Sequence, residues 1–440
     1  MGLVVNRLKK GIIVSWLGIA AAVLFMVSPY YSGAREGAPD PMHNQAMQFS
    51  GRFLVGIDIL LGGAVNLEQH VEQLRRDLEK PENSGMPVKI VPIIFELSGR
   101  EAALEELERL RENYTDDETV RDIALFSRLY HEGEQSLTHE QRRTIERYGW
   151  IGKLALSQDK ESSHPQRQAV VQSAVQTVIV ISLFAIAVLA ALTTGFFLLA
   201  FTISLRCKGM LRSRLSMPPT PRDSLLESFA IYMTGFFALP AAAVLLLPDK
   251  ALPSLTIMII GVLVAVFWPH LRGSSRENIR NALGWHRGRG FWRETGAGII
   301  GYITGLPLML GAFLIVLLLT RLSGITPSHP VAQQIGGDPL QIVMLFILAC
   351  LWAPVVEEFF FRGVFYGYLR HHASWVVSGL ATALLFAVIH PQGWIGVPLL
   401  ATSGFILSAI REWRGSIIAP ISAHALNNGV ALFLAMVALS

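Results

Sequence analysis

Long apolar segments separated by short loops fill the second half of the chain. A helix needs about 20 apolar residues to cross the hydrocarbon core of a bilayer, and several of these segments reach that length. Hydrophobic residues make up 52% of the chain and charged residues 16%, against roughly 25% charged in soluble domains. The expected spans lie at 169–204, 225–247, 254–270, 295–320, 340–369, 375–391, 394–410 and 415–438. The pattern predicts an all-α polytopic membrane protein, a bundle of about eight or nine transmembrane helices.

Charge divides the chain into two regimes. Residues 35–168 have a net charge of −7 and the remainder has +11, counted over Asp, Glu, Lys and Arg. We therefore expect an N-terminal membrane anchor or signal peptide at 1–34, an inserted, mainly helical extramembrane domain at 35–168, and a polytopic domain at 169–440. The anchor is favoured because the apolar run at 11–27 is slightly longer than a typical signal core. No basic stripe is interleaved with aromatic residues, so nucleic acid is not an expected partner.

Basic loop residues predict the orientation in the membrane. Loops 205–224 and 271–294 together carry eleven Lys or Arg residues, whereas the loops that alternate with them have only Lys250 and Arg321. Because basic loops remain on the cytoplasmic side, the N-terminus is expected in the cytoplasm and residues 35–168 outside it. With the signal-like N-terminus, this pattern favours a multi-pass protein of the bacterial inner membrane.

The inserted domain shows apolar residues at helical spacing among many charged ones. Its segment 88–97 is apolar and β-branched and contains a proline, which fits a strand or a short helix. Asp116 or Asp117 is expected to cap one helix, and Thr138 begins a T-x-x-Q capping box for another. No catalytic constellation occurs here, so the domain is expected to bind, regulate or position a partner.

Two adjacent glutamates, Glu357 and Glu358, lie inside the expected span 340–369. One carboxylate in hydrocarbon costs about 2.5–3.5 kcal/mol on insertion scales, so a pair needs a reason. Glu358 and Arg362 are four residues apart and share a helix face, which predicts an ion pair. Glu357 points about 100° away from Glu358 and need not share that arginine. A desolvated carboxylate near a second one suits a general base that acts on water.

Three further polar residues, His390, His424 and Asn428, lie in later apolar segments. At 1.5 Å per helical residue, Glu357 and these three lie roughly 14–22 Å from the cytoplasmic ends of their spans, so all four can meet at one level. His424 and Asn428 are four residues apart and can offer donors to a developing oxyanion. His390 precedes Pro391, where a helix tends to end, and could hold an attacking water with Glu357.

The three motifs occur in a fixed order: E-E-x-x-x-R at Glu357–Arg362, F-x-x-x-H at Phe386–His390 and H-x-x-x-N at His424–Asn428. Together they resemble the pattern of the CAAX-protease and bacteriocin-processing family of intramembrane proteases, also called the CPBP or Abi family. Each motif alone is weak evidence, but the ordered set is specific. The resemblance covers roughly residues 295–438 and does not extend to 35–168.

This resemblance implies an intramembrane endopeptidase that hydrolyses a peptide bond of a membrane-associated protein or peptide. The catalytic set it implies is Glu357, Glu358, Arg362, His390, His424 and Asn428. Glu357 would activate the water and His390 would help to position it. His424 with Asn428 would stabilise the oxyanion. Glu358 and Arg362 would support these groups.

The family is often described as metalloproteases, and a glutamate with two histidines could in principle hold zinc. The ligands would then be Glu357, His390 and His424. The chain has no H-E-x-x-H motif, and these ligands would come from three helices. Glutamate chemistry with no cofactor is therefore favoured, with zinc as the alternative.

Two other functions are open at this stage. Intramembrane Glu and His residues can form a proton relay, which fits a proton-coupled transporter. A single polar cluster without a clear paired repeat argues against that reading. The second alternative is a non-catalytic membrane scaffold whose outer domain binds a partner. The expected partners are a membrane-associated peptide or protein substrate, the lipid bilayer and a partner of residues 35–168.

Overall fold

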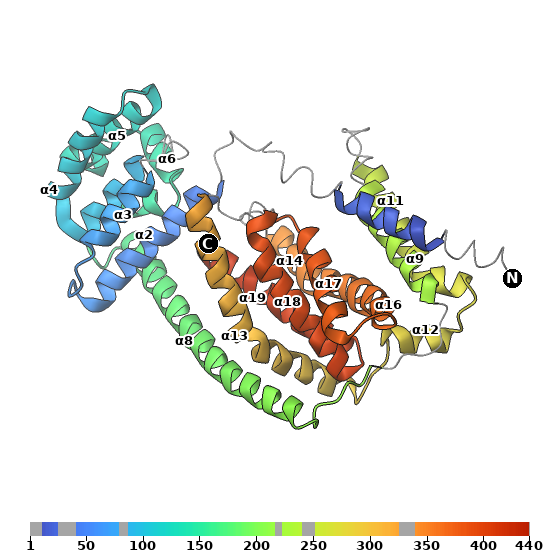
Figure 1. Cartoon of the computed structure of the whole chain (residues 1–440). Helices are drawn as coiled ribbons and strands as arrows, with labels where there is room; N and C mark the ends of the chain where they lie inside the picture. Colours follow the sequence, from blue (N-terminus) through green and yellow to red (C-terminus); the bar gives the residue numbers. More distant parts are fainter. Residues whose placement is uncertain are drawn as a thin grey trace. The chain divides into compact units, whose positions relative to one another are not determined.

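Every regular element in the described part of this computed structural model is a helix (Figure 1), which confirms the all-α class. The structure describes residues 11–24, 41–78, 87–215, 222–239, 251–324 and 339–439. Within the anchor or signal peptide expected at 1–34, the described residues form the apolar helix Gly11–Leu24. Much of that segment therefore lies outside the described residues.

The chain divides into two compact units. The small unit consists of Gly37–Val188 with Phe433–Ser440, and the large unit consists of Met1–Glu36 with Leu189–Leu432. The boundary between them falls within one long helix, α8 (Pro165–Cys207). Because α8 continues through residues 169–188, the small unit includes the start of a segment that the sequence pattern reads as a membrane span.

The small unit is a cluster of short helices around an apolar core. Its helices are α2 (Pro41–Leu61), α3 (Glu68–Leu78), α4 (Ile90–Asn113), α5 (Asp117–Glu132), α6 (His139–Glu146) and α7 (Trp150–Ala155), with the first part of α8. The core includes Val55, Ile93, Phe126 and Ile151, all fully buried. The segment 88–97 is helical, because a 3₁₀ turn at Pro87–Lys89 leads directly into α4 and leaves its proline within the first turn.

Both predicted helix caps are present in the small unit. The side chain of Asp116 accepts a hydrogen bond from the backbone N–H of Thr119 at the start of α5. Thr138 and Gln141 form the reciprocal capping box at the start of α6. These contacts satisfy backbone donors that a helix start otherwise leaves free.

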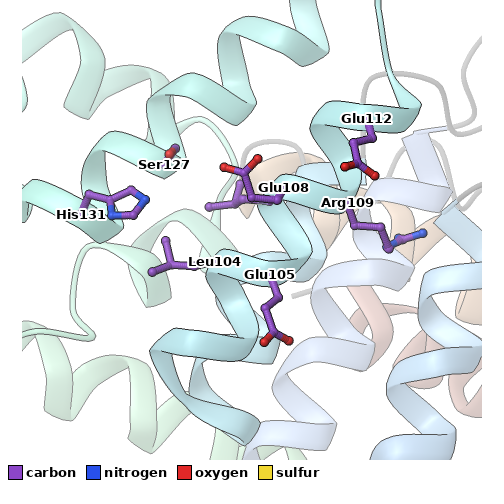
Figure 2. A pocket seen from close by; sticks show the side chains of 8 residues that line it. Leu104, Glu105, Glu108, Arg109, Glu112, Ser127 and His131 are labelled. Atoms are coloured by element: carbon purple, nitrogen blue, oxygen red, sulfur yellow. The ribbon is translucent and has the colours of Figure 1, made fainter.

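A surface pocket of about 480 Å³ lies between α4 and α5 of the small unit. Figure 2 shows Glu105, Glu108 and Glu112 projecting from α4, with Ser127 and His131 on α5. Its acidic lining agrees with the net negative charge of this part of the sequence.

Lys89 is the least expected charge in the small unit, because its side chain is buried among α4, α5 and the loop before α7. Its ammonium lies 5.5 Å from the centroid of the Tyr148 ring, and the Tyr148 hydroxyl donates to Asp122. Burial lowers the pKa of Lys89 from 10.5 to about 8, and the charge of Asp122 opposes that shift. Between pH 8 and pH 10.5 the Lys89 amine is therefore protonated in the unfolded chain and largely neutral in the folded chain.

The stability of the small unit is therefore expected to rise by about 2 kcal/mol between pH 7.5 and pH 9.5. Lys89→Met should remove this rise, because methionine fills the space without a titrating group. Hydrogen exchange of α4 and α5 amides in the full chain, corrected for intrinsic rates, measures the effect. Wild-type protection that stays constant over this range, or an unchanged rise in Lys89→Met, would contradict the assignment.

The large unit contains the long apolar helices of an integral, multi-pass membrane protein. Among the described residues, five helices are long and apolar enough to cross a bilayer, or six if one bent pair counts as a span. The five are Pro165–Cys207, Phe291–Ser323, Leu340–Arg370, Gly393–Arg414 and Ile418–Val437. The large unit also contains α9 (Arg222–Met233), and the span expected at 225–247 lies partly outside the described residues.

One expected span is shorter in the structure than in the sequence prediction, and another is followed by a helix that was not predicted. The span expected at 375–391 is a 14-residue helix, α17 (Trp375–Val388), which ends shortly before Pro391. The span expected at 254–270 is α11 (Ala251–Leu271), after which the chain bends by 120° into the short amphipathic helix α12 (Arg276–Leu283). The sequence pattern predicted a loop where α12 lies.

The glutamate pair lies on a helical segment, Pro339 to Arg370, in which two π-helical stretches interrupt the α-helix. Its parts are α14 (Pro339–Ile347), the π-helical η6 (Leu348–Trp352), α15 (Ala353–Glu358), the π-helical η7 (Phe359–Phe365) and α16 (Tyr366–Arg370). Short π segments inside an α-helix occur frequently at functional sites. Here the two π segments flank α15, the short α-helix that carries both glutamates.

Candidate active site

Three elements of the large unit carry the polar residues singled out in the sequence. Glu357 and Glu358 end α15, and Arg362 follows in η7. His390 lies just after α17, while His424 and Asn428 belong to α19 (Ile418–Leu439). The structure brings the two glutamates, the arginine and both histidines together. Asn428 points to a different partner.

Glu357 faces both histidines without a direct hydrogen bond to either. Its Oε2 lies 3.9 Å from His390 Nε2 and 3.8 Å from His424 Nε2. In the described part of the chain this oxygen has no hydrogen-bond partner, although the side chain is only 24% exposed. A buried carboxylate oxygen without a donor is costly, so this position calls for a bound polar group.

The ring of His390 is fixed by Phe386, one turn earlier. Its Nδ1 contacts the backbone carbonyl of Phe386, and the two rings lie 4.2 Å apart between centroids. Because a carbonyl can only accept, Nδ1 carries the proton and a neutral His390 has its lone pair on Nε2. That lone pair is on the nitrogen that faces Glu357.

Glu358 joins the arginine to the second histidine. Its Oε1 accepts from Arg362 Nη1 at 2.7 Å, which is the ion pair expected from the sequence, and from His424 Nδ1 at 2.8 Å. Both Glu358 and Arg362 are fully buried. The second contact was not expected, and it orients His424 so that Nε2 points toward Glu357. A carboxylate that holds one histidine nitrogen in this way fixes both ring orientation and tautomer.

The buried positive charge of Arg362 is stabilised by several neighbouring groups. Its Nη2 donates to the carbonyl of Gly404 at 3.0 Å, and its guanidinium lies 4.5 Å from the Phe386 ring centroid. A Cβ on Gly404 would lie 3.1 Å from the backbone of Ala383, so a glycine at this position lets α17 and α18 (Gly393–Arg414) approach closely. Ion pairing, a backbone acceptor and a cation–π contact together make this buried charge tolerable.

Asn428 is engaged by the backbone of the glutamate-bearing helix. Its Nδ2 donates to the carbonyl of Ala349 at 2.8 Å. The local winding explains why that carbonyl is available: the N–H of Ala353 bonds to Leu348, and Pro354 has no N–H to donate. Asn428 therefore satisfies an acceptor that the π segment and the proline leave open. This contact uses one of the two N–H groups of the Asn428 amide.

Asn428→Leu is expected to destabilise the large unit by about 1–3 kcal/mol, because the Ala349 carbonyl is left without a donor. Asn427→Leu is the matched control, since the Asn427 amide makes only longer contacts of 3.3 and 3.4 Å. Unfolding of the purified chain in mixed micelles compares the two. An equal loss in both variants, or none in Asn428→Leu, would show that the Ala349 contact is unimportant.

Tyr232 is a neighbour of the site that sequence reasoning did not select. Its ring stacks on Phe360 with centroids 3.9 Å apart, and its fully buried hydroxyl has no hydrogen-bond partner among the described residues. It comes from α9, more than 100 residues before the motifs. In the sequence, Tyr232 is a tyrosine within an apolar segment, and such tyrosines are too common to indicate a site.

The fit of a metal ion can be judged from the side chains of the described residues. They contain no group of three or more His, Cys, Asp or Glu side chains arranged to hold a metal. Of the three ligands considered from the sequence, His424 has Nδ1 on Glu358, and its Nε2 lies 3.8 Å from Glu357.

The fold and site define an integral multi-pass membrane protein with a polar cluster between its helices. Residues 339–430 match the family model described as type II CAAX prenyl endopeptidase Rce1-like, which is a model of the CPBP family. That segment includes all six residues selected from the sequence. The match agrees with an intramembrane endopeptidase in general.

One relative gives a second comparison. An uncharacterized 24.3 kDa protein of Escherichia coli is 26% identical over 129 residues, which cover 27% of this chain and 59% of that protein. The chain thus spans less than two thirds of this relative's length. No solved structure matches the chain. The activity of the whole protein is therefore taken up as a proposal.

Proposed function

We propose that this protein is an intramembrane endopeptidase in which Glu357 activates water to hydrolyse a peptide bond of a membrane-associated protein or peptide. The observation that carries the proposal is the convergence of His390 Nε2 and His424 Nε2 on Glu357 Oε2, at 3.9 and 3.8 Å. These separations exceed a direct hydrogen bond, and a water at normal hydrogen-bond distance from both atoms of either pair fits them.

The two acceptors on this water are Glu357 Oε2 and His390 Nε2. Because Phe386 keeps the proton of His390 on Nδ1, neither atom donates to the water and both can receive its protons. The water oxygen is then left with its lone pairs free for attack. This arrangement supports Glu357 as the general base and His390 as the group that positions the nucleophile.

Charge balance supports a different role for His424. The cluster holds the two carboxylates of Glu357 and Glu358 and one guanidinium, that of Arg362, which pairs with Glu358, so one negative charge is left over. A proton on His424 neutralises the cluster, with Nδ1–H on Glu358 and Nε2–H directed toward the site. That second N–H is a suitable donor to the oxyanion of a tetrahedral intermediate.

The proposed reaction balances without another reactant. The water oxygen bonds to the carbonyl carbon as one water proton passes to Glu357, and the carbonyl π electrons move to the oxygen facing His424. When the intermediate collapses, the C–N bond breaks and Glu357 returns the proton to the leaving amine. The products are a carboxylic acid and an amine, and Glu357 is again a carboxylate.

We further propose the bacterial inner membrane as the location, with residues 35–168 outside the cytoplasm, where they bind or position a partner. The alternation of basic and weakly charged loops supports this orientation. Metal-free chemistry is proposed over zinc held by Glu357, His390 and His424. Cleavage by the purified protein in the presence of a strong chelator tests this choice, and loss that added zinc restores would favour the metal.

His390→Ala is expected to lower kcat for a membrane-anchored peptide about 10²-fold, because the water loses one of its two acceptors. Proteoliposomes of the purified variant measure this, with peptides that accumulate in cells expressing Glu357→Gln supplying the substrate. His372→Ala is the matched control, since that exposed histidine lies in the turn after α16. Full activity in His390→Ala would remove the proposed role of this residue.

A further inference from the structure

An apolar groove of about 610 Å³ lies between α11, α12 and the glutamate-bearing helix of the large unit. Its walls include Val262 and Val266 of α11, Leu283 of α12, and Val355, Val356 and Phe359 of the helical segment 339–370. Three protein elements thus leave a long apolar space that side chains of the chain itself do not fill. An extended hydrocarbon chain matches this lining.

The groove is charged on one wall only. Among its lining residues are His270, Arg276 and Arg280, and no lining residue is acidic. Arg276 and Arg280 are exposed and form no ion pair within the described residues, whereas nearby Arg272 pairs with Glu227 at 2.9 Å. The groove therefore combines an apolar body with uncompensated positive charge, which complements an amphiphile with an anionic head.

The surroundings of the charged wall match a membrane surface. Chain direction changes by 120° between α11 and α12, and α12 is a short amphipathic helix within the basic loop 271–294. Trp285 and Trp352 line the same groove and are 48% and 52% exposed. Tryptophan and amphipathic basic helices concentrate at the bilayer interface, and cytoplasmic leaflets are rich in anionic lipids.

Glu357 is rotated away from two of the groove residues, Val355 and Val356, whereas the groove residue Phe360, three positions on, lies nearer to its face. At about 100° per residue, Glu357 is rotated about 100° from Val356 and about 160° from Val355. Glu357 does not line the groove. Because Glu357 is not part of the lining and the charged residues there are basic, the groove suits an anionic lipid better than a peptide bond to be cleaved.

We propose that this groove is a binding site for an anionic phospholipid. An acyl chain lies against Val262, Val355 and Phe359, and the phosphate lies on Arg276 and Arg280. The site depends on neither Glu357 nor catalysis. A Glu357→Gln chain is expected to bind the lipid as the wild type does, so failure of the hydrolase proposal would leave this one standing.

Photolabelling tests the site in the purified full chain. Phosphatidylglycerol with a diazirine on its acyl chain is expected to label peptides that contain 262–283 and 352–360. The same probe with a phosphatidylcholine head should label them at least several-fold less. Arg276→Gln with Arg280→Gln should reduce the phosphatidylglycerol labelling about tenfold or more, while size-exclusion behaviour and helix content remain unchanged.

The matched control is Arg287→Gln with Arg293→Gln, which removes the same charge from the same loop outside the groove. This control should label as the wild type does. Equal labelling by both lipids, equal loss in both double variants, or labelling that avoids the groove peptides would overturn the proposal. Displacement of the probe by a cleaved peptide would instead assign the groove to the substrate.

Discussion

Glu357→Gln is expected to lower kcat for peptide cleavage by about 10⁴-fold, the upper end of what a general base contributes. Glutamine keeps the size and shape of the side chain but cannot take a proton from water. Its amide is also ambiguous toward the water, because it offers a donor where the carboxylate offers only acceptors. The expected loss is therefore larger than that of His390→Ala, which leaves the base in place.

The substitution should leave the fold intact. Glu357 is 24% exposed, and its Oε2 has no hydrogen-bond partner in the described part of the chain, so no buried donor is orphaned. Glu277→Gln is a suitable control, because it makes the same chemical change at an exposed carboxylate of α12 and leaves the site residues unchanged. Cleavage of a membrane-anchored peptide in proteoliposomes is the measurement. Wild-type kcat in Glu357→Gln would eliminate the mechanism proposed for this chain.

Glu358→Met is expected to have the largest effect on stability, about 3–5 kcal/mol, because it leaves the guanidinium of Arg362 buried without its counter-charge. Arg362→Met should also be destabilising, since it removes the counter-charge of Glu358 and leaves His424 Nδ1 as the remaining donor to that carboxylate. The double variant should be more stable than either single variant, because a fully apolar pair carries no uncompensated charge.

Measurements of peptide cleavage distinguish the role of Glu358 from that of Arg362 in this double-mutant cycle. Glu358→Met and the double variant also release His424 Nδ1, so the ring loses its orientation toward Glu357 and cleavage should fall sharply in both. Titration with a denaturing detergent, followed by far-ultraviolet circular dichroism, measures the stability of all four proteins. Additive losses in the double variant would show that the two residues do not act as a pair. Full activity in a folded double variant would exclude an orienting role for Glu358.

The sequence alone was sufficient for features that depend on neighbouring residues. Apolar segments predicted membrane helices because each residue of a spanning helix must be compatible with lipid. The spacing of Glu358 and Arg362 predicted their ion pair, since residues four apart lie on one helix face. The caps at Asp116 and Thr138 follow from the same short range.

Contacts between distant segments required the tertiary structure. The bond from His424 to Glu358 joins residues 66 positions apart, and nothing in either motif selects it over a direct contact with Glu357. Likewise, the spacing of His424 and Asn428 suggested two donors on one site. The hydrogen bond of the Asn428 amide to the carbonyl of Ala349 was not predictable, because it depends on Pro354 and the π segment leaving that carbonyl free.

The sequence by itself therefore determined the class of fold, the candidate site residues and the local ion pair between Glu358 and Arg362. The tertiary structure decided that Glu357 Oε2 has no hydrogen-bond partner among the described residues, that Nε2 of each histidine faces it, and where α11 bends into α12. The physical reason is range. Propensity, capping and polarity act within a turn or two of helix, whereas the side-chain partners of the site are set by how separate helices pack.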